Sequence, residues 1–127
     1  MIRSLHFARS CYLHLAGKVG VALCRRLIEL RWVTQGVDGN ARLTEEGKKG
    51  LSTMGIDIEH LGKGKKPLLR FCLDGSEKKP HLAGKIGDRL LECFLEEGWF
   101  KREGSSRKLI LTKVGEEKLR GMGVQIM

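Results

Sequence analysis

The chain has 127 residues, 41% of them hydrophobic, and carries a formal net charge of +9 with a pI near 9.7. This hydrophobic content excludes wholesale disorder, and no apolar run approaches the roughly 20 residues of a membrane span. Residues 1–67 hold 12 basic and 6 acidic side chains, and residues 68–127 hold 12 and 9, so the positive charge is not confined to one tail. Because Lys and Arg neutralise phosphates, this charge favours a nucleic-acid partner, with solubility as the alternative interpretation.

The sequence contains an internal repeat. His14–Lys18 returns as His81–Lys85 at an offset of 67 residues, and Leu43-Thr44 returns as Leu111-Thr112 after a one-residue insertion. Such self-similarity indicates a tandem duplication whose units fold alike. The expected organisation is a first winged-helix-like repeat, a basic linker and a second such repeat, over residues 1–61, 62–69 and 70–127.

In the first unit, Val19, Leu23 and Leu27 recur at helical spacing and predict an amphipathic helix. Two extended runs, 32–35 and 41–44, then flank an Asp-Gly turn and predict a β-hairpin. Thr44 is expected to cap a short second helix with its hydroxyl. Gly55 is expected to end that helix.

The second unit repeats this order. A helix is expected with Pro80 in its first turn, where the missing N–H is tolerated. Runs 99–102 and 107–112 predict the hairpin, and Thr112 is the expected cap of the last helix. Gly47 and Gly115 follow the two capping threonines by three residues, and we expect each to let the hairpin backbone approach closely. The fold class is therefore α+β and mainly helical, with helix, hairpin and short helix in each unit.

Three segments carry a family pattern: Arg9–Leu23 reads RxCYxHLAGKxGVAL, Leu43–Gly47 reads LTxxG, and Arg70–Gly84 reads RxCLDxSExxPHLAG. The chain resembles the C-terminal half of ArsR-like winged-helix transcriptional regulators of bacteria. The resemblance implies a dimeric regulator that associates with DNA. It also implies that DNA is contacted through a separate N-terminal helix-turn-helix domain in such proteins. Four cysteines without dense spacing indicate reduced thiols, so a cytoplasmic location is expected.

Cysteine and histidine supply the candidate effector site. Cys11-x-x-His14 and Cys72 with His81 offer two thiolates and two imidazoles, the donor types of a tetrahedral zinc site. Cys72 and His81 lack the tight spacing of a zinc knuckle, which argues against a metal, and duplication alone explains the recurrence of the two pairs. We therefore expect no metal, no other cofactor and no disulfide. The effector candidates are Cys11, His14, Cys72, Asp74 and His81, with the histidines near a helix start and bonded to backbone or to Asp74.

The second hairpin carries the candidate DNA contacts. Basic side chains bracket its tip, and a basic hairpin suits contact with phosphates. A solvated charged hairpin is the alternative. The expected DNA-binding residues are Lys101, Arg102, Arg107 and Lys108. Residues 63–66 and Arg70 are a second basic segment, explained equally well as a solvated linker.

No enzyme signature is present in the sequence. The glycines near Lys65 lack the spacing and the Ser/Thr of a P-loop, and no nucleophile elbow or zinc-protease motif occurs. We expect a protein without catalytic activity. Two functions stay open: a DNA-associated transcriptional regulator or its C-terminal module, or an effector-binding or protein-interaction domain without direct DNA contact.

Overall fold

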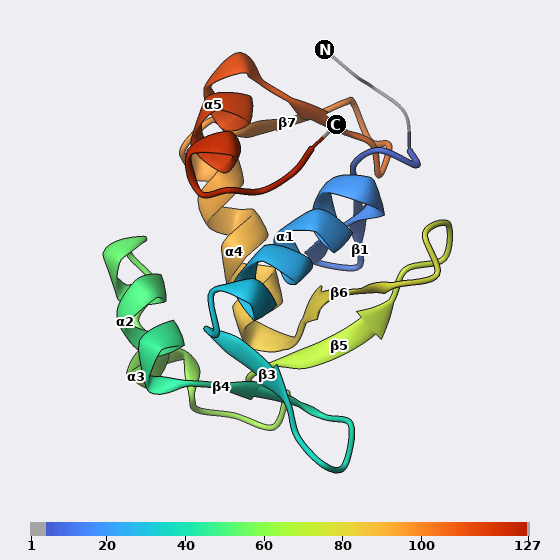
Figure 1. Cartoon of the computed structure of the whole chain (residues 1–127). Coiled ribbons are helices and arrows are strands. Elements are labelled where there is room, and N and C mark those ends of the chain that lie inside the picture. Colours follow the sequence, from blue (N-terminus) through green and yellow to red (C-terminus); the bar gives the residue numbers. More distant parts are fainter. Residues whose placement is uncertain (1–4, 127) are drawn as a thin grey trace.

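Two successive sets of elements follow the same order along the chain, except that the first set ends with an additional short helix (Figure 1). The structure is a computed structural model that describes residues 5–126, so positions 1–4 and 127 of the expected units lie outside it. The first set comprises β1 (Arg9–Cys11), β2 (His14–Ala16), α1 (Gly17–Glu29), β3 (Val33–Gln35), β4 (Ala41–Leu43), α2 (Glu45–Thr53) and α3 (Ile58–Leu61). The second comprises β5 (Arg70–Leu73), β6 (Pro80–Ala83), α4 (Gly84–Glu96), β7 (Phe100–Arg102), β8 (Leu109–Leu111) and α5 (Lys113–Gly121).

The fold is α+β, with five helices and four two-stranded antiparallel hairpins among the described residues. The expected sequence of helix, hairpin and short helix is present in both sets. Each set also begins with a hairpin that sequence patterning did not predict, β1–β2 and β5–β6. The placement of Pro80 in a helix was wrong: it is the first residue of β6, and α4 begins at Gly84. A proline is tolerated there because the first residue of a strand can lack its ladder donor.

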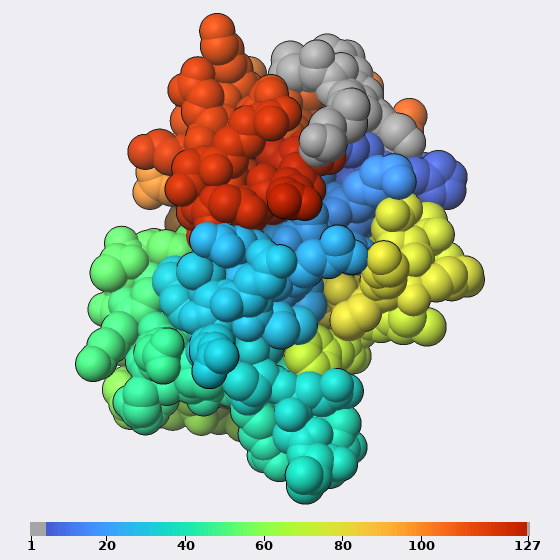
Figure 2. Space-filling model, in the orientation of Figure 1, coloured from blue at the N-terminus to red at the C-terminus, as the bar shows by residue number. Residues whose placement is uncertain are grey.

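The two sets exchange contacts reciprocally around β2 and β6. Helix α1 of the first set packs against β6, helix α4 of the second packs against β2, and β2 and β6 also lie together. Figure 2 shows this packing at the surface: the blue residues of α1, from the first set, lie between the red C-terminal residues and the yellow β5–β6 loop of the second set. Reciprocal contacts of this kind are those that a twofold relation produces. One hydrophobic core therefore includes residues of both sets, among them Leu27, Leu51, Phe94 and Leu119.

The two short helices begin with equivalent threonine caps, as the sequence predicts. The Gly47 N–H donates to Thr44 Oγ1 at 2.9 Å, and the Gly115 N–H donates to Thr112 Oγ1 at 3.0 Å. A Cβ on Gly115 would lie 2.1 Å from the Trp99 carbonyl oxygen, which confirms that this glycine permits a close backbone approach. No helix within residues 5–126 is both long and apolar enough to cross a membrane.

We expect Gly84→Ala to destabilise the protein by about 2–3 kcal/mol. Gly84 has φ of +82°, and an added Cβ would lie 2.8 Å from the Pro67 carbonyl oxygen, so backbone strain and a backbone clash act together. Gly121→Ala is the control, because a Cβ there meets nothing within 4 Å and its φ is ordinary. Urea unfolding should show a stability unchanged or slightly raised for Gly121→Ala. Equal midpoints for the two variants would contradict this account.

Candidate functional site

The two hairpins missed by sequence patterning place each cysteine directly across from a histidine. Cys11 pairs with His14 in β1–β2, and Cys72 pairs with His81 in β5–β6. The first turn has two residues and the second has six, residues 74–79, so the spacing along the chain differs while the cross-strand pairing is the same. The Cys–His pairs are therefore equivalent in the fold.

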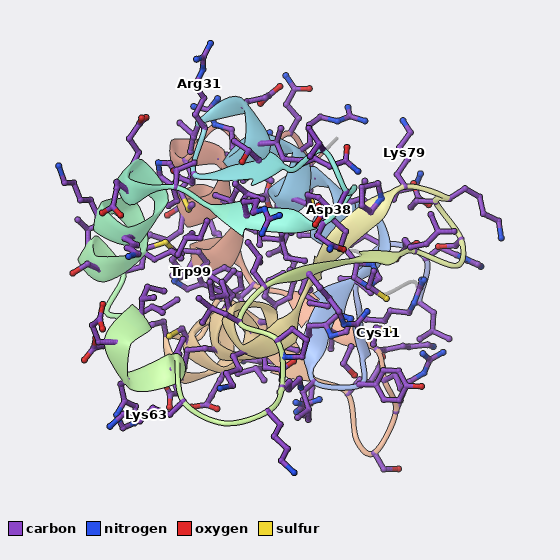
Figure 3. All side chains as sticks on the ribbon, turned by 90° about the horizontal axis from the view of Figure 1, so that it is seen from below. Cys11, Arg31, Asp38, Lys63, Lys79 and Trp99 are labelled. Carbon is purple, nitrogen blue, oxygen red and sulfur yellow. The ribbon has the colours of Figure 1, made fainter. Side chains whose placement is uncertain are left out.

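Packing of β2 against β6 brings both pairs into one cluster. One ligand atom from each of Cys11, His14, Cys72 and His81 lies within 4.8 Å of every other. The two Nε2 atoms are 3.1 Å apart. The histidines are buried, at 2% and 1% exposure, whereas both cysteines are half-buried. Figure 3 shows Cys11 on the N-terminal strand. We call these four residues the Cys–His cluster.

Asp74, an effector candidate from the sequence, lies beside this cluster and is fully buried. Its Oδ1 accepts the Gly17 N–H at 2.7 Å, and its carboxylate pairs with Arg9 at 3.1 Å. The remaining donors to Asp74 are Ser76 N–H and Oγ, Glu77 N–H and His81 Nδ1, at 3.2, 3.0, 2.9 and 3.0 Å. Burial alone would raise the pKa of Asp74, but these hydrogen bonds and Arg9 hold the pKa well below its usual range. Asp74 is therefore a carboxylate at neutral pH.

The ionised Asp74 fixes the tautomer of His81. Because a carboxylate only accepts, His81 Nδ1 has to donate to it, which leaves a lone pair on Nε2 of the neutral ring. That lone pair faces His14 Nε2. Burial and the nearby His81 lower the pKa of His14 to about 4, and burial lowers the pKa of His81 as well. The lowered pKa values favour neutral rings, and with the lone pair on His81 Nε2 the hydrogen bond between the two Nε2 atoms is donated by His14. Ligation through His14 Nε2 therefore requires the proton of that ring to move to Nδ1.

The cluster's thiols are close to each other and to the basic hairpin. Burial, and then Cys72, raise the pKa of Cys11, while Arg9 and Arg107 oppose the increase. All four cysteines of the chain have free thiols.

Cys24 and Cys93 are buried outside the cluster, as expected from the sequence, and burial raises the pKa of Cys24 to about 12.

The second hairpin, β7–β8, holds the four candidate DNA contacts at its tip. Lys101, Arg102 and Arg107 are exposed and Lys108 is half-buried. None of the four forms an ion pair within residues 5–126; Glu116 pairs with Arg120 instead. Neighbouring strand residues point to opposite faces, so Lys101 and Arg102 present charge on both sides of the hairpin.

Strand β1 connects this hairpin to the Cys–His cluster. The Ser10 N–H donates to the Arg107 carbonyl at 2.9 Å, and Arg9 forms an isolated bridge with Lys108. Cys11 is the next residue along the same strand. Strand β1 therefore brings the candidate effector residues next to the candidate DNA contacts. Lys63 of the linker, by contrast, points outward at another side of the molecule from Cys11 (Figure 3).

Two participants were missed by sequence reasoning. Arg9 pairs with Asp74 across 65 positions of the sequence, and only its place in the family pattern singled it out. Asp88 lies on α4, with Oδ1 3.7 Å from His14 Nδ1. Asp88 falls on the polar side of a predicted helix, and this position gave no sign that it would lie next to His14.

The chain is similar to a curated relative, an uncharacterized HTH-type transcriptional regulator named YdfF from Bacillus subtilis (strain 168). The two are 40% identical over 114 residues, which cover 90% of this chain and 50% of the relative. The chain thus spans about half the length of the relative it matches. No family model matches the chain. No solved structure shows significant similarity to it.

Proposed function

We propose that the chain acts in the regulation of transcription, as a DNA-associated module of a helix-turn-helix regulator. The observation that carries this proposal is the 40% identity, over 90% of the chain, with a protein named as an HTH-type transcriptional regulator. The charge of +9 supports it, as do the basic side chains on β7–β8, which form no ion pair with any residue between 5 and 126, since phosphate neutralisation supplies most non-specific DNA affinity.

Within that function, the chain corresponds to the C-terminal half of an ArsR-like regulator. The motifs around His14 and His81 support this assignment, and the helix followed by a hairpin in each unit supports winged-helix-like repeats. In this arrangement the chain works as a homodimer and a separate N-terminal helix-turn-helix domain reads the bases. The chain itself adds regulatory or dimerisation contacts and a non-specific contact with phosphates.

We expect neutralisation of the hairpin to weaken binding to random duplex DNA. The wild type should bind with Kd on the order of 10⁻⁴–10⁻⁶ M at physiological salt, as is typical of non-specific contact. Replacing Arg102 and Arg107 by Gln should lower the affinity equally for all sequences and flatten the salt slope by about two charges. Fluorescence anisotropy over a series of salt concentrations measures both effects.

The control variant removes the same charge elsewhere. Lys49 and Lys79 are exposed and form no ion pair within the described residues. Their joint replacement by Gln should leave the salt slope close to that of the wild type. If the hairpin variant kept full affinity, the contact would lie elsewhere, with residues 63–66 the next basic segment to neutralise.

A specific observation also favours an effector-binding or interaction domain without direct DNA contact. The Cys–His cluster is formed by both units and lies at their junction, a location suited to sensing a ligand. The same anisotropy experiment separates the two functions. Absence of DNA binding by the wild type at low salt would replace the DNA-associated function with this one.

A further inference from the structure

We propose that Cys11, His14, Cys72 and His81 bind one divalent cation of the zinc type at the junction of the two units. This site does not rest on the proposed role in transcription. The wide separation of Cys72 and His81 along the sequence argues against a metal, but the strand register removes this objection, because each cysteine lies directly across from its histidine. Two thiolates and two imidazoles are a donor set typical of tetrahedral zinc.

The distances suit such an ion. With Zn–S bonds of about 2.3 Å and Zn–N bonds of about 2.0–2.1 Å, a tetrahedron places its sulfurs about 3.8 Å apart and its nitrogens about 3.3 Å apart. The two Nε2 atoms are 3.1 Å apart, and all four ligand atoms lie within 4.8 Å of one another. Shortening the largest distance between two ligand atoms by about 1 Å gives the tetrahedral geometry.

Both histidines have a carboxylate behind the ring, as metal-binding histidines usually do. Asp74 accepts from His81 Nδ1 at 3.0 Å and directs Nε2 toward the cluster. Asp88 Oδ1 is buried, accepts no hydrogen bond from any described residue and lies 3.7 Å from His14 Nδ1. A small shift of His14 toward the cation's preferred geometry would let Nδ1 donate to this oxygen.

Charge and access also favour a divalent cation. Binding releases the two thiol protons, and the two thiolates then neutralise the charge of the ion. The half-buried cysteines form the side through which an ion enters, while the histidines form the buried side.

Cobalt titration of the reduced, chelator-treated full chain tests the site. Co²⁺ should bind as one ion per chain, with the thiolate-to-metal charge-transfer absorption and the d–d bands of a tetrahedral S₂N₂ site. Zn²⁺ should displace it at one equivalent and protect Cys11 and Cys72 from alkylation. Cys11→Ser and Cys72→Ser should each lower cobalt affinity by at least about 100-fold, and Asp88→Asn by about 10–100-fold with the thiolate band retained.

Cys93→Ser is the matched control, because it makes the same chemical change outside the cluster and should bind cobalt as the wild type does. Wild-type spectra and alkylation decide the question even where a variant folds poorly. The proposal is overturned by an octahedral cobalt spectrum, by no binding to the reduced wild type, or by a thiolate band of undiminished intensity and affinity in both serine variants. It is equally overturned if Cys11 and Cys72 close to a disulfide in air and their reduced form takes up no metal.

Discussion

Asp74→Asn is expected to lower the free energy of unfolding by about 3–5 kcal/mol, because it leaves Arg9 buried without its counter-ion. Arg9 is only 8% exposed and Asp74 is fully buried. The carboxylate oxygens of Asp74 are surrounded by hydrogen-bond donors. The NH₂ group of an asparagine is itself a donor, so it would face these groups without forming a hydrogen bond. Denaturant unfolding should show a lower midpoint with an unchanged m-value.

Glu77→Gln is the control for this effect. Its carboxylate pairs with the exposed Lys18 at 3.3 Å, and such surface pairs contribute less than about 1 kcal/mol. The Glu77 backbone N–H that donates to Asp74 is unchanged by this substitution. Equal losses of stability in the Asp74 and Glu77 variants would show that the buried pair has no special role.

The Asp74→Asn substitution should also change how the free energy of unfolding depends on pH in the acid range. The folded-state pKa of Asp74 lies below its unfolded value of about 3.9, so the unfolded state binds the proton more readily. The contribution of Asp74 is therefore fully present above about pH 5 and is lost as the pH falls through about 4 and below. Asp74→Asn should lack this component of acid unfolding.

Phe94→Ala is expected to cost about 3–5 kcal/mol, the range for removal of a large buried aromatic side chain. Phe94 is 1% exposed, stacks on Trp99 at a centroid distance of 4.5 Å and meets Phe100 at 6.2 Å. Its loss leaves a cavity beneath the hairpin that carries the basic residues. Thermal and denaturant unfolding should both detect the change.

Two further variants bracket the cost of removing Phe94. Phe94→Leu should cost clearly less than Phe94→Ala, because leucine fills part of the cavity. Val114→Ala, at a position that is 50% exposed, should stay within about 0.5 kcal/mol of the wild type. An alanine variant at position 94 as stable as Val114→Ala would mean that the core repacks around the lost ring.

Elements with long or chemically marked patterns could be predicted from the sequence. The apolar spacing of Leu23 and Leu27 indicated α1, and Thr44 and Thr112 marked the starts of two helices by a capping mechanism that does not depend on the rest of the fold. The turn before Ala41 indicated a hairpin because Asp-Gly adopts the necessary backbone conformation.

The first hairpin of each unit could not be predicted in the same way. The turn of β1–β2 is Tyr12-Leu13, which lacks the Asp-Gly marker that indicated the hairpin before Ala41, and strands of three residues are too short to be recognised by alternation alone. Besides pairing with each other, both strands depend on contacts distant in the sequence, since β1 bridges to Lys108 and β2 lies against β6. The equivalence of the two Cys–His pairs depends on these strands. The sequence therefore supplied the right residues for the cluster but not their common geometry.

Strand β1 connects the Cys–His cluster directly to the basic hairpin. Ser10 is held to Arg107 on one side, and Cys11 belongs to the cluster at the next position. A ligand that moves Cys11 at the cluster also displaces the neighbouring Ser10, which is bonded to the basic hairpin. Coupling of this kind is reciprocal: an occupant of the cluster that alters the hairpin's affinity for a polyanion must have its own affinity altered by the same factor.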